Sequence, residues 1–281
     1  MKILVTGAGG QVGGSLIDHG AQNNCEVVGL DRAALDISDL SAVQAVLNDQ
    51  QPDIVINAAA YTAVDRAEAE SERALAINAT GPENLALVCK KLDIPLLHIS
   101  TDFVFDGDKQ GAYVETDSVA PLSVYGVSKA KGETNIAAVG GKHIILRTAW
   151  VFGGEQNFVT TMLRLGASRT ELNIVDDQIG GPTSCEDIAQ CLLTIATRVV
   201  DGDFSEWGIY HYCGAPSVSW FGFASAIFAG KEAPKLNPIP TKDYPTPAVR
   251  PKNSVLDCTK IKQIFNIDQP DWRSALSSFL G

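Results

Sequence analysis

The sequence has few basic residues: 22 Lys and Arg stand against 33 Asp and Glu, giving a formal net charge of −11 over 281 residues. Such a chain repels phosphate backbones, so we expect no nucleic-acid partner, although a local cationic pocket for a small anion is compatible with this charge. No run approaches the roughly 20 apolar residues that a membrane-spanning helix needs. The first strand-like segment, KILVTG, begins at residue 2 and leaves no room for a targeting sequence. We therefore expect a cytoplasmic protein without a membrane partner.

The cysteines contain no CxxC pair, and several of them lie in apolar stretches. This pattern is typical of buried free thiols in a reducing compartment, and the spacings do not suit a metal site. The six residues are Cys25, Cys89, Cys185, Cys191, Cys213 and Cys258.

Apolar segments alternate with helical patterns over the first 150 residues. The apolar segments are continuous, as in strands buried on both faces of a parallel sheet. They span 2–6, 26–31, 53–58, 95–101 and 143–149, and the helical patterns between them span 11–22, 40–48, 72–92 and 119–138. This alternation predicts an α/β protein with a doubly wound parallel sheet, the Rossmann fold.

After about residue 150 the composition changes. Pro and Gly cluster at 180–182, 238–240 and 245–251, while helical patterns continue at 158–167, 186–199, 220–228 and 271–279. We expect residues 1–150 to form a dinucleotide-binding domain. Residues 151–281 should form mainly a smaller C-terminal substrate-binding lobe, with some segments returning to the sheet.

A glycine pattern, GxxGxxG, follows the first predicted strand directly and precedes the first helix. It consists of Gly7, Gly10 and Gly13. Glycine permits a sharp turn and the close approach of a backbone to a pyrophosphate, and the start of the helix offers free N–H groups to that anion. Glycines also make ordinary turns, so the loop alone does not establish a dinucleotide site.

The second predicted strand ends in Asp31-Arg32, eighteen residues after Gly13. An acidic residue here can bind the ribose hydroxyls of NAD, whereas Arg32 can hold the 2′-phosphate of NADP. These two readings leave the choice between NADH and NADPH open. Asp36 and Ile37 suit the border of an adenine site, although Asp36 also suits a cap for the next helix. Loop, strand and acid together predict dinucleotide binding.

The stretch SVYGVSKAKGE, at 123–133, places Tyr125 and Lys129 one helical turn apart, on one face. Reduction of a carbonyl needs a hydride at carbon and a proton at oxygen. A phenol has a pKa of about 10, and a nearby ammonium lowers it toward the working range. Thr101, at the end of the fourth predicted strand, is placed to give a hydroxyl to the same carbonyl oxygen. The three residues together predict a reductase site.

On these residues the chain resembles the extended short-chain dehydrogenase/reductases, and within them the dTDP-4-dehydrorhamnose reductases. The resemblance covers nearly the whole chain. It is carried by GAGGQVGGSL (7–16), INAAAYTAVDRAE (56–68), STDFVFDG (100–107), PLSVYGVSKAKGE (121–133), RTAWVFG (147–153), DDQIGGPTS (176–184) and YPTPAVRPKNSVLD (244–257). The resemblance implies NADPH- or NADH-dependent reduction of the 4-keto group of dTDP-4-dehydro-β-L-rhamnose to dTDP-β-L-rhamnose, in cell-surface polysaccharide synthesis.

The resemblance also implies roles for individual residues. Tyr125 would donate the proton, Lys129 would bind the ribose and tune Tyr125, and Thr101 would assist near C4 of the sugar. The remaining implied contacts are to the cofactor, from Gly10, Gln11, Val12, Ala58, Ala59, Ala60, Tyr61 and Thr62, and to the substrate, from Thr101, Asp102, Phe103, Trp150 and Arg250. Trp150 also suits core packing, and Arg250 also suits a solvated surface. The implied partner is a small nucleotide sugar, bound by a monomer or a homodimer.

The chain departs from the family pattern at two places. Phe103 stands where the dehydratases of the superfamily carry a glutamate, and phenylalanine cannot move a proton, so a 4,6-dehydratase is disfavoured. Some family members bind Mg²⁺ through a glutamate after QVG, but this chain has Gly14-Ser15 there. Serine is a poor ligand for this hard cation, so we expect no metal site.

Two alternatives fit the same residues. One is a reductase or epimerase of another nucleotide-deoxysugar, which would share the three catalytic residues. The other is a dinucleotide-binding regulatory subunit without activity, because the resemblance extends to a regulatory subunit of methionine adenosyltransferase. The complete set of Thr101, Tyr125 and Lys129 favours an enzyme.

Overall fold

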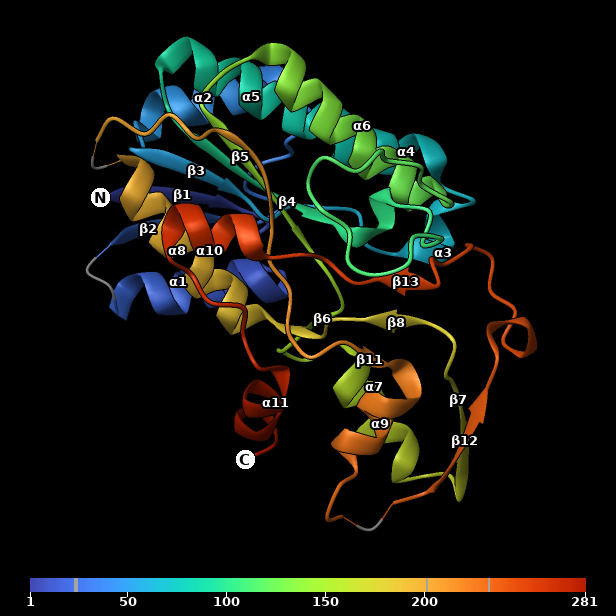
Figure 1. Ribbon diagram of the computed structural model, residues 1–281. Coiled ribbons are helices and arrows are strands. Elements are labelled where there is room, and N and C mark those ends of the chain that lie inside the picture. The colour runs from blue at the N-terminus through green and yellow to red at the C-terminus, as the bar shows by residue number, and fades with distance from the viewer. Residues whose placement is uncertain (23–24, 201, 232) are drawn as a thin grey trace.

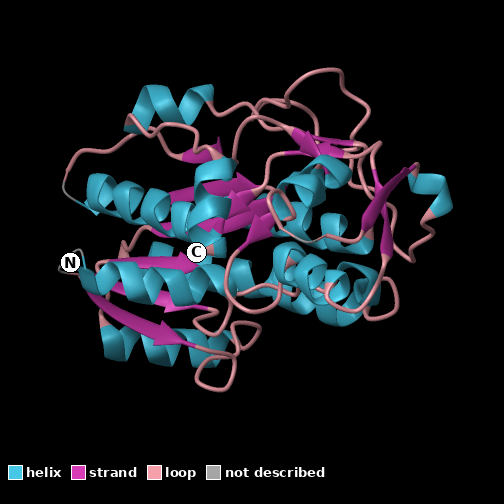
Figure 2. Ribbon diagram, turned by 90° about the horizontal axis from the view of Figure 1, so that it is seen from below, coloured by secondary structure: helices cyan, strands magenta, loops and turns pink. Residues whose placement is uncertain are grey.

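The computed structural model describes residues 1–22, 25–200, 202–231 and 233–281. Its centre is a sheet of six parallel strands in the order β10-β5-β4-β3-β1-β2 (Figures 1 and 2). The strands are β1 (Lys2–Thr6), β2 (Glu26–Leu30), β3 (Ile54–Asn57), β4 (Leu96–Thr101), β5 (His143–Thr148) and β10 (Gly208–His211). The strand order reverses between β1 and β3, and ligands of such sheets bind beyond the carboxyl ends of the strands at this point.

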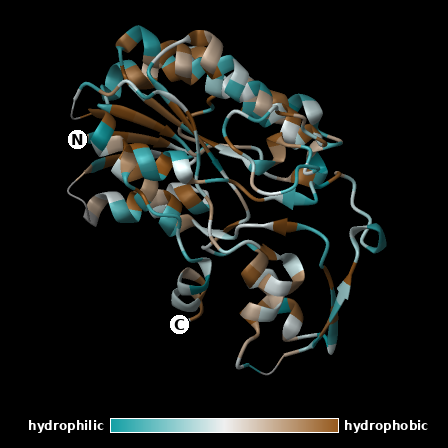
Figure 3. Cartoon of the chain, in the orientation of Figure 1, coloured by the Kyte–Doolittle hydropathy of each residue, from teal (hydrophilic) through white to brown (hydrophobic). Residues whose placement is uncertain are grey.

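Helices cover both faces of this sheet (Figure 1). One face carries α2 (Leu40–Gln50), α5 (Gly81–Leu92) and α6 (Val124–Val139), and the other carries α1 (Gln11–Gln22), α8 (Cys185–Val200) and α10 (Thr259–Phe265). Each layer encloses its own apolar core, and the central strands are the most hydrophobic part of the chain (Figure 3). The predicted doubly wound α/β fold is confirmed.

The remaining elements gather beside the carboxyl ends of the strands and enclose a third apolar core. Its helices are α7 (Phe158–Gly166), α9 (Trp220–Ile227) and α11 (Trp272–Leu280). Short strands complete it: β7 (Glu171–Val175) pairs with β12 (Lys235–Ile239), β6 (Val151–Phe152) with β9 (Thr183–Ser184), and β8 (Ile179–Gly180) with both β11 (Val218–Ser219) and β13 (Asn253–Ser254).

The helix expected over 72–92 is instead three pieces. They are α4 (Ser71–Leu75), a π-helical turn (Ala76–Thr80) and α5, and the short α3 (Val64–Ala67) precedes them. Pro82 lies in the first turn of α5 and has no N–H to continue a regular helix from the preceding turn. The wider π turn places Asn78 against the loop after β3, where it takes part in the site described below.

Two further expectations need correction, and one strand of the sheet was not predicted. The strand β2 is only partly buried, because it lies at the edge of the sheet. The helix expected from residue 119 begins at Val124, since the Ser123 hydroxyl accepts the Gly126 N–H at 3.2 Å and caps the first turn. The sixth strand, β10, was not expected, because GIYH is too short and too mixed to signal a strand.

The described cysteines form no disulfide, and five of them are buried, whereas Cys25 is partly buried. No helix among the described residues is long and apolar enough to cross a membrane.

Candidate active site

The glycine loop turns sharply after β1 and packs closely on two neighbours. Gly7 has a φ of +72°, and a Cβ there would lie 2.5 Å from the backbone nitrogen of Ala59. A Cβ on Gly13 would lie 2.1 Å from the carbonyl oxygen of Gly7. Only glycine therefore fits at these two positions, and the backbone is left bare beside the start of α1. This cradle fits a pyrophosphate approaching the helix N-terminus.

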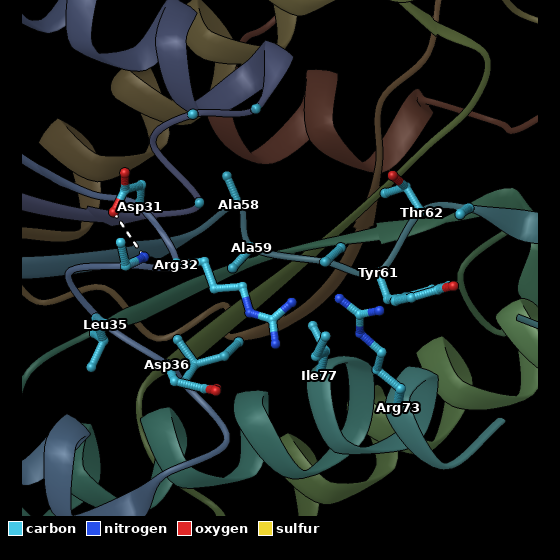
Figure 4. Close-up of a pocket in the computed structure, with 17 residues that line it drawn as sticks. Asp31, Arg32, Leu35, Asp36, Ala58, Ala59, Tyr61, Thr62, Arg73 and Ile77 are labelled. Carbon is cyan, nitrogen blue, oxygen red and sulfur yellow. Dashed lines mark hydrogen bonds between the residues drawn. The ribbon is translucent and has the colours of Figure 1, made fainter. Parts of the chain in front are cut away.

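A cavity beside this loop gathers most of the residues expected to bind the dinucleotide (Figure 4). Its lining includes Gly7, Gly10, Asp31, Arg32, Asp36, Ile37, Ala58, Ala59, Ala60, Tyr61 and Thr62. Asp31 accepts the N–H groups of Ala33 and Ala34 through one carboxylate oxygen, which shapes the turn after β2. Figure 4 shows the Arg32 side chain extending from this turn into the cavity.

The alternative role considered for Asp36, a helix cap, is wrong. Asp36 accepts the N–H and hydroxyl of Ser38 at 3.0 and 2.6 Å, and the cap of α2 is Asp39. The Ser38 hydrogen bonds hold the pKa of Asp36 below its usual value. Asp36 thus stays charged and structures the turn that forms one wall of the cavity.

The same cavity contains a second arginine, Arg73 of α4, which sequence reasoning missed. Its guanidinium lies over the ring of Tyr61 at 5.5 Å and binds Glu70 at 3.1 Å. In Figure 4 the Arg32 and Arg73 guanidinium groups point into the same space from opposite walls. No motif marks Arg73, because it lies 41 positions after Arg32 and only the fold brings the two residues together.

A side chain of the π turn fixes the loop after β3 (residues 58–62) through hydrogen bonds to its backbone. The Asn78 side chain accepts the N–H of Tyr61 at 2.8 Å and donates to its carbonyl oxygen at 3.0 Å. It also donates to the Ser128 hydroxyl on α6 at 3.0 Å. One buried amide therefore ties the expected cofactor loop to the helix that carries Tyr125 and Lys129.

A second cavity, of about 1130 Å³, continues from the first past the glycine loop. It is large enough for a nicotinamide and a sugar nucleotide. All residues expected to act on or bind the substrate line it, namely Thr101, Asp102, Phe103, Tyr125, Lys129, Trp150 and Arg250, together with the expected cofactor residues Gln11 and Val12. The structure also adds Asn157, Trp220 and Phe279 from the C-terminal elements.

Tyr125 lies in the first turn of α6, with its ring edge-on to Phe103 at 5.6 Å. Burial raises the pKa of Tyr125 to about 12, while the Thr101 hydroxyl beside the phenol opposes this shift and the Asp102 charge adds to it. The lowering of the Tyr125 pKa that we expected from the Lys129 ammonium is absent here, because the Lys129 amine is bound to groups of β4.

The amine of Lys129 is bound by two groups of β4, an inner strand of the sheet. It donates to the Ile99 carbonyl oxygen at 2.6 Å and lies 3.1 Å from Nε2 of His98. Lys129 is 2 % exposed, and this burial lowers its pKa to about 8, with Glu133 opposing the shift. Sequence reasoning missed His98, because a single histidine in a buried strand carries no motif.

Asp102 follows Thr101 at the end of β4 and accepts its hydroxyl at 2.9 Å. Burial raises the pKa of Asp102 to about 6. The Thr101 and Ser254 hydroxyls beside the carboxyl oppose this rise, and the residue lines the cavity although it is 2 % exposed.

Trp150 and Arg250 form the outer part of the second cavity. Trp150 adopts a φ of +47°, which is rare for a bulky residue and is typical of functional sites. Its ring stacks on Trp220 at 3.5 Å, so it has a packing role as well as a cavity face. Arg250 is not a freely solvated surface residue, because it binds both oxygens of Asp65, at 3.1 and 2.8 Å.

The position of the family's metal-binding glutamate does not fit Mg²⁺ in this chain. Gly14 and Ser15 lie there in α1, and the Ser15 hydroxyl hydrogen-bonds to Cys185 Sγ at 3.1 Å. Neither residue offers a carboxylate.

Comparison with known proteins agrees with this geometry. The family model described as the RmlD substrate binding domain matches residues 1–281. A dTDP-4-dehydrorhamnose reductase of Aggregatibacter actinomycetemcomitans is 47% identical over 289 residues, covering 99% of this chain and 97% of that protein. The corresponding reductase of Escherichia coli is 39% identical, covering 100% and 97%.

Solved structures show the same relationship. A dTDP-4-dehydrorhamnose reductase of Clostridium acetobutylicum superimposes with a TM-score of 0.94 at 38% identity, over 100% of this chain and 98% of that one. One of Bacillus anthracis, solved in complex with NADP, gives 0.93 at 35% identity, over 99% and 98%. The chain therefore belongs to the family of dTDP-4-dehydrorhamnose reductases.

Proposed function

We propose that this protein is an NAD(P)H-dependent oxidoreductase that reduces the 4-keto group of dTDP-4-dehydro-β-L-rhamnose to give dTDP-β-L-rhamnose. The observation that carries the proposal is that Thr101, Tyr125 and Lys129 line one cavity, which opens onto the glycine loop after β1. The relatives named as dTDP-4-dehydrorhamnose reductases, and the one solved with NADP, support the choice of substrate and cofactor.

The cofactor, when bound, supplies a hydride to C4 of the sugar. The residues of the chain do the rest. Tyr125 gives its phenolic proton to the oxygen at C4, and Thr101 donates a hydrogen bond to the same oxygen as charge develops on it. Lys129 binds the nicotinamide ribose and, as an ammonium, lowers the pKa of Tyr125. Phe103 packs edge-on against the Tyr125 ring and helps to fix its orientation.

Other residues hold the two ligands. We propose that Gly7, Gly10, Gln11, Val12 and Gly13 receive the pyrophosphate, and that the loop 58–62 borders the cofactor. Arg250 suits the phosphates of the nucleotide sugar, because a guanidinium carries five N–H donors and its contacts with Asp65, Thr246 and Ala248 do not use all of them. Asp102 and Trp150 would line the sugar.

The two halves of the chain bind different ligands in this proposal. We propose that residues 1–150 bind the dinucleotide and that residues 151–281 mainly bind the substrate, with α8 and β10 returning to the central sheet. We further propose a cytoplasmic enzyme that works as a monomer or homodimer.

A coupled absorbance assay tests this proposal. dTDP-4-dehydrorhamnose is generated in place by the upstream dehydratase and epimerase, and loss of NADH and of NADPH is followed separately after addition of the protein. Oxidation that requires the epimerase supports the proposal. Oxidation with the dehydratase product alone would assign a different deoxysugar, and binding of NAD(P)H without any oxidation would favour a regulatory subunit.

A further inference from the structure

A chain of buried hydrogen bonds leads from the end of β3 to the amine of Lys129. The Ala59 N–H donates to Oδ1 of Asn57 at 3.1 Å, and the Thr6 hydroxyl donates to the same oxygen at 2.7 Å. Because a backbone N–H can only donate, the atom it meets must be the amide oxygen of Asn57. The nitrogen of this amide then faces Nδ1 of His98, at 2.9 Å.

This orientation of Asn57 determines where His98 carries its proton. An amide nitrogen can only donate, so Nδ1 of His98 accepts and has no hydrogen of its own. A neutral imidazole with a bare Nδ1 carries its proton on Nε2. The ring is 0 % exposed, and this burial keeps the pKa of His98 well below its usual value, so the ring stays neutral.

The proton on Nε2 points at Nζ of Lys129, 3.1 Å away. An ammonium has three donors and no acceptor, so it cannot receive this N–H. An uncharged amine can, through its lone pair, while it donates to the Ile99 carbonyl oxygen at 2.6 Å. The position of Lys129 under β4 therefore suits the amine and not the ammonium.

The other charged groups around Lys129 do not reverse this preference. Glu133, one turn further along α6, is already bound by Arg147 of β5 at 2.9 and 2.6 Å and by the Ser100 hydroxyl at 2.5 Å. Tyr125 is a neutral phenol, and Asp102 lies on the Thr101 side of the cavity. The burial that lowers the pKa of Lys129 to about 8 acts in the same direction as His98.

We propose that His98 is a positioning residue that holds Lys129 inward as an uncharged amine, and that Lys129 takes up a proton from water when it turns toward Tyr125. The proposal rests on the role given to Lys129 in the proposed function. Both side chains line the same cavity, so the turn needs only the lysine side chain to move. The ammonium would then lie beside the phenol and lower its pKa, which the inward amine does not do.

His98→Gln tests the coupling through the pH dependence of turnover. The glutamine can turn its carbonyl oxygen toward Nζ and accept from an ammonium, so Lys129 would keep its proton to a higher pH and stay inward. We expect the alkaline limb of kcat to move up by about one pH unit and kcat near neutral pH to fall about tenfold. The matched control is His143→Gln, at the opposite end of the sheet, which should change neither. A lower kcat with an unmoved limb would overturn the proposal.

The tautomer is measured independently of turnover, by ¹H–¹⁵N correlation of the imidazole nitrogens in histidine-labelled protein. The chain has four histidines, so the His98 signals can be assigned by elimination with variants at the other three, even where His98→Gln does not fold. We expect a neutral ring with its proton on Nε2 from about pH 6 to about pH 9. A proton on Nδ1, or an imidazolium, would overturn the proposal. This result stands whatever sugar the enzyme reduces, so the two proposals fail separately.

Discussion

Both terminal nitrogens of Arg250 donate to the carboxylate of Asp65, at 3.1 and 2.8 Å, although the two residues are 185 positions apart. The pair joins the segment before β13 to α3 at the rim of the second cavity. The same guanidinium donates to the Thr246 hydroxyl and the Ala248 carbonyl oxygen, at 2.6 and 3.1 Å. Arg250 is thus held in one orientation while its charge faces the cavity.

Replacing Arg250 by lysine should weaken binding of the nucleotide sugar more than it slows chemistry. Lysine keeps the charge but loses the fork that matches Asp65 and a diphosphate. We expect the KM for the sugar nucleotide to rise about tenfold with kcat nearly unchanged. The matched control is Arg273→Lys on α11, whose guanidinium lies over Trp272. Equal kinetics for Arg250→Lys and the parent protein would remove Arg250 from the substrate site.

Arg32 and Arg73 should both favour NADPH over NADH. Their guanidinium groups converge in the adenosine cavity (Figure 4), where a 2′-phosphate would meet them and a 2′-hydroxyl would gain little. For Arg32→Ala and Arg73→Ala we expect the KM for NADPH to rise about tenfold and that for NADH to change much less. Arg66→Ala, which removes a guanidinium paired with Glu70, serves as the control. Equal effects on both cofactors would refute this role.

Tyr125→Phe should keep binding of NAD(P)H and lose turnover. The phenyl ring can still pack on Phe103 but has no proton to give. We expect kcat to fall by at least about a hundredfold, with the cofactor Kd within about twofold of the parent value. Fluorescence titration of NADPH and the coupled assay measure the two quantities. Turnover near the parent rate would remove Tyr125 from the mechanism.

The features predicted best from the sequence are those whose structure depends on residues adjacent in the chain. The glycine loop, the strand-end Thr101 and the YxxxK helix each depend on neighbouring residues, and the structure brings them into adjacent cavities. The residues that were missed depend on contacts distant in sequence. Arg73 reaches Arg32 only through the fold, and His98 matters only because Asn57 and Lys129 meet it from two other elements.

The direction of the Lys129 side chain is a second example. The four-residue spacing predicted that Lys129 lies beside Tyr125 on one face of a helix. Both residues are in α6, and both line the second cavity. The spacing could not show that the Ile99 carbonyl and His98 compete for the amine. Similarly, hydropathy predicted five strands buried on both faces, but the edge position of β2 follows only from the order of the strands.

Buried His211 should make the fold sensitive to acid. It lies against the Tyr113 carbonyl oxygen at 3.1 Å and the Arg147 guanidinium at 3.4 Å, and burial followed by Arg147 lowers its pKa to about 3. In the unfolded chain its pKa is about 6.5, so between these values the unfolded chain binds more protons. The free energy of unfolding should therefore fall as the pH drops from about 6.5 toward about 3, by up to about 1.4 kcal/mol per pH unit for this residue.

Urea denaturation at several pH values measures this dependence. His211→Gln removes one titrating group, so its free energy of unfolding should fall less steeply with acid than that of the parent. His143→Gln, which replaces a partly buried histidine at the start of β5, controls for the loss of a histidine side chain as such. Identical slopes for His211→Gln and the parent protein would show that His211 is not kept neutral by the fold.

In the proposed reaction the cofactor gives a hydride to C4 of the sugar, and Tyr125 supplies the proton to the oxygen. The most direct test uses NADPH deuterated at the transferred position, with dTDP-4-dehydrorhamnose made in place, and locates the deuterium in the product by NMR. We predict deuterium at C4 of dTDP-β-L-rhamnose with the parent protein, and no labelled product above background with Tyr125→Phe. Deuterium at another carbon would show that C4 does not receive the hydride. A labelled product formed equally well by Tyr125→Phe would show that Tyr125 is not the proton donor.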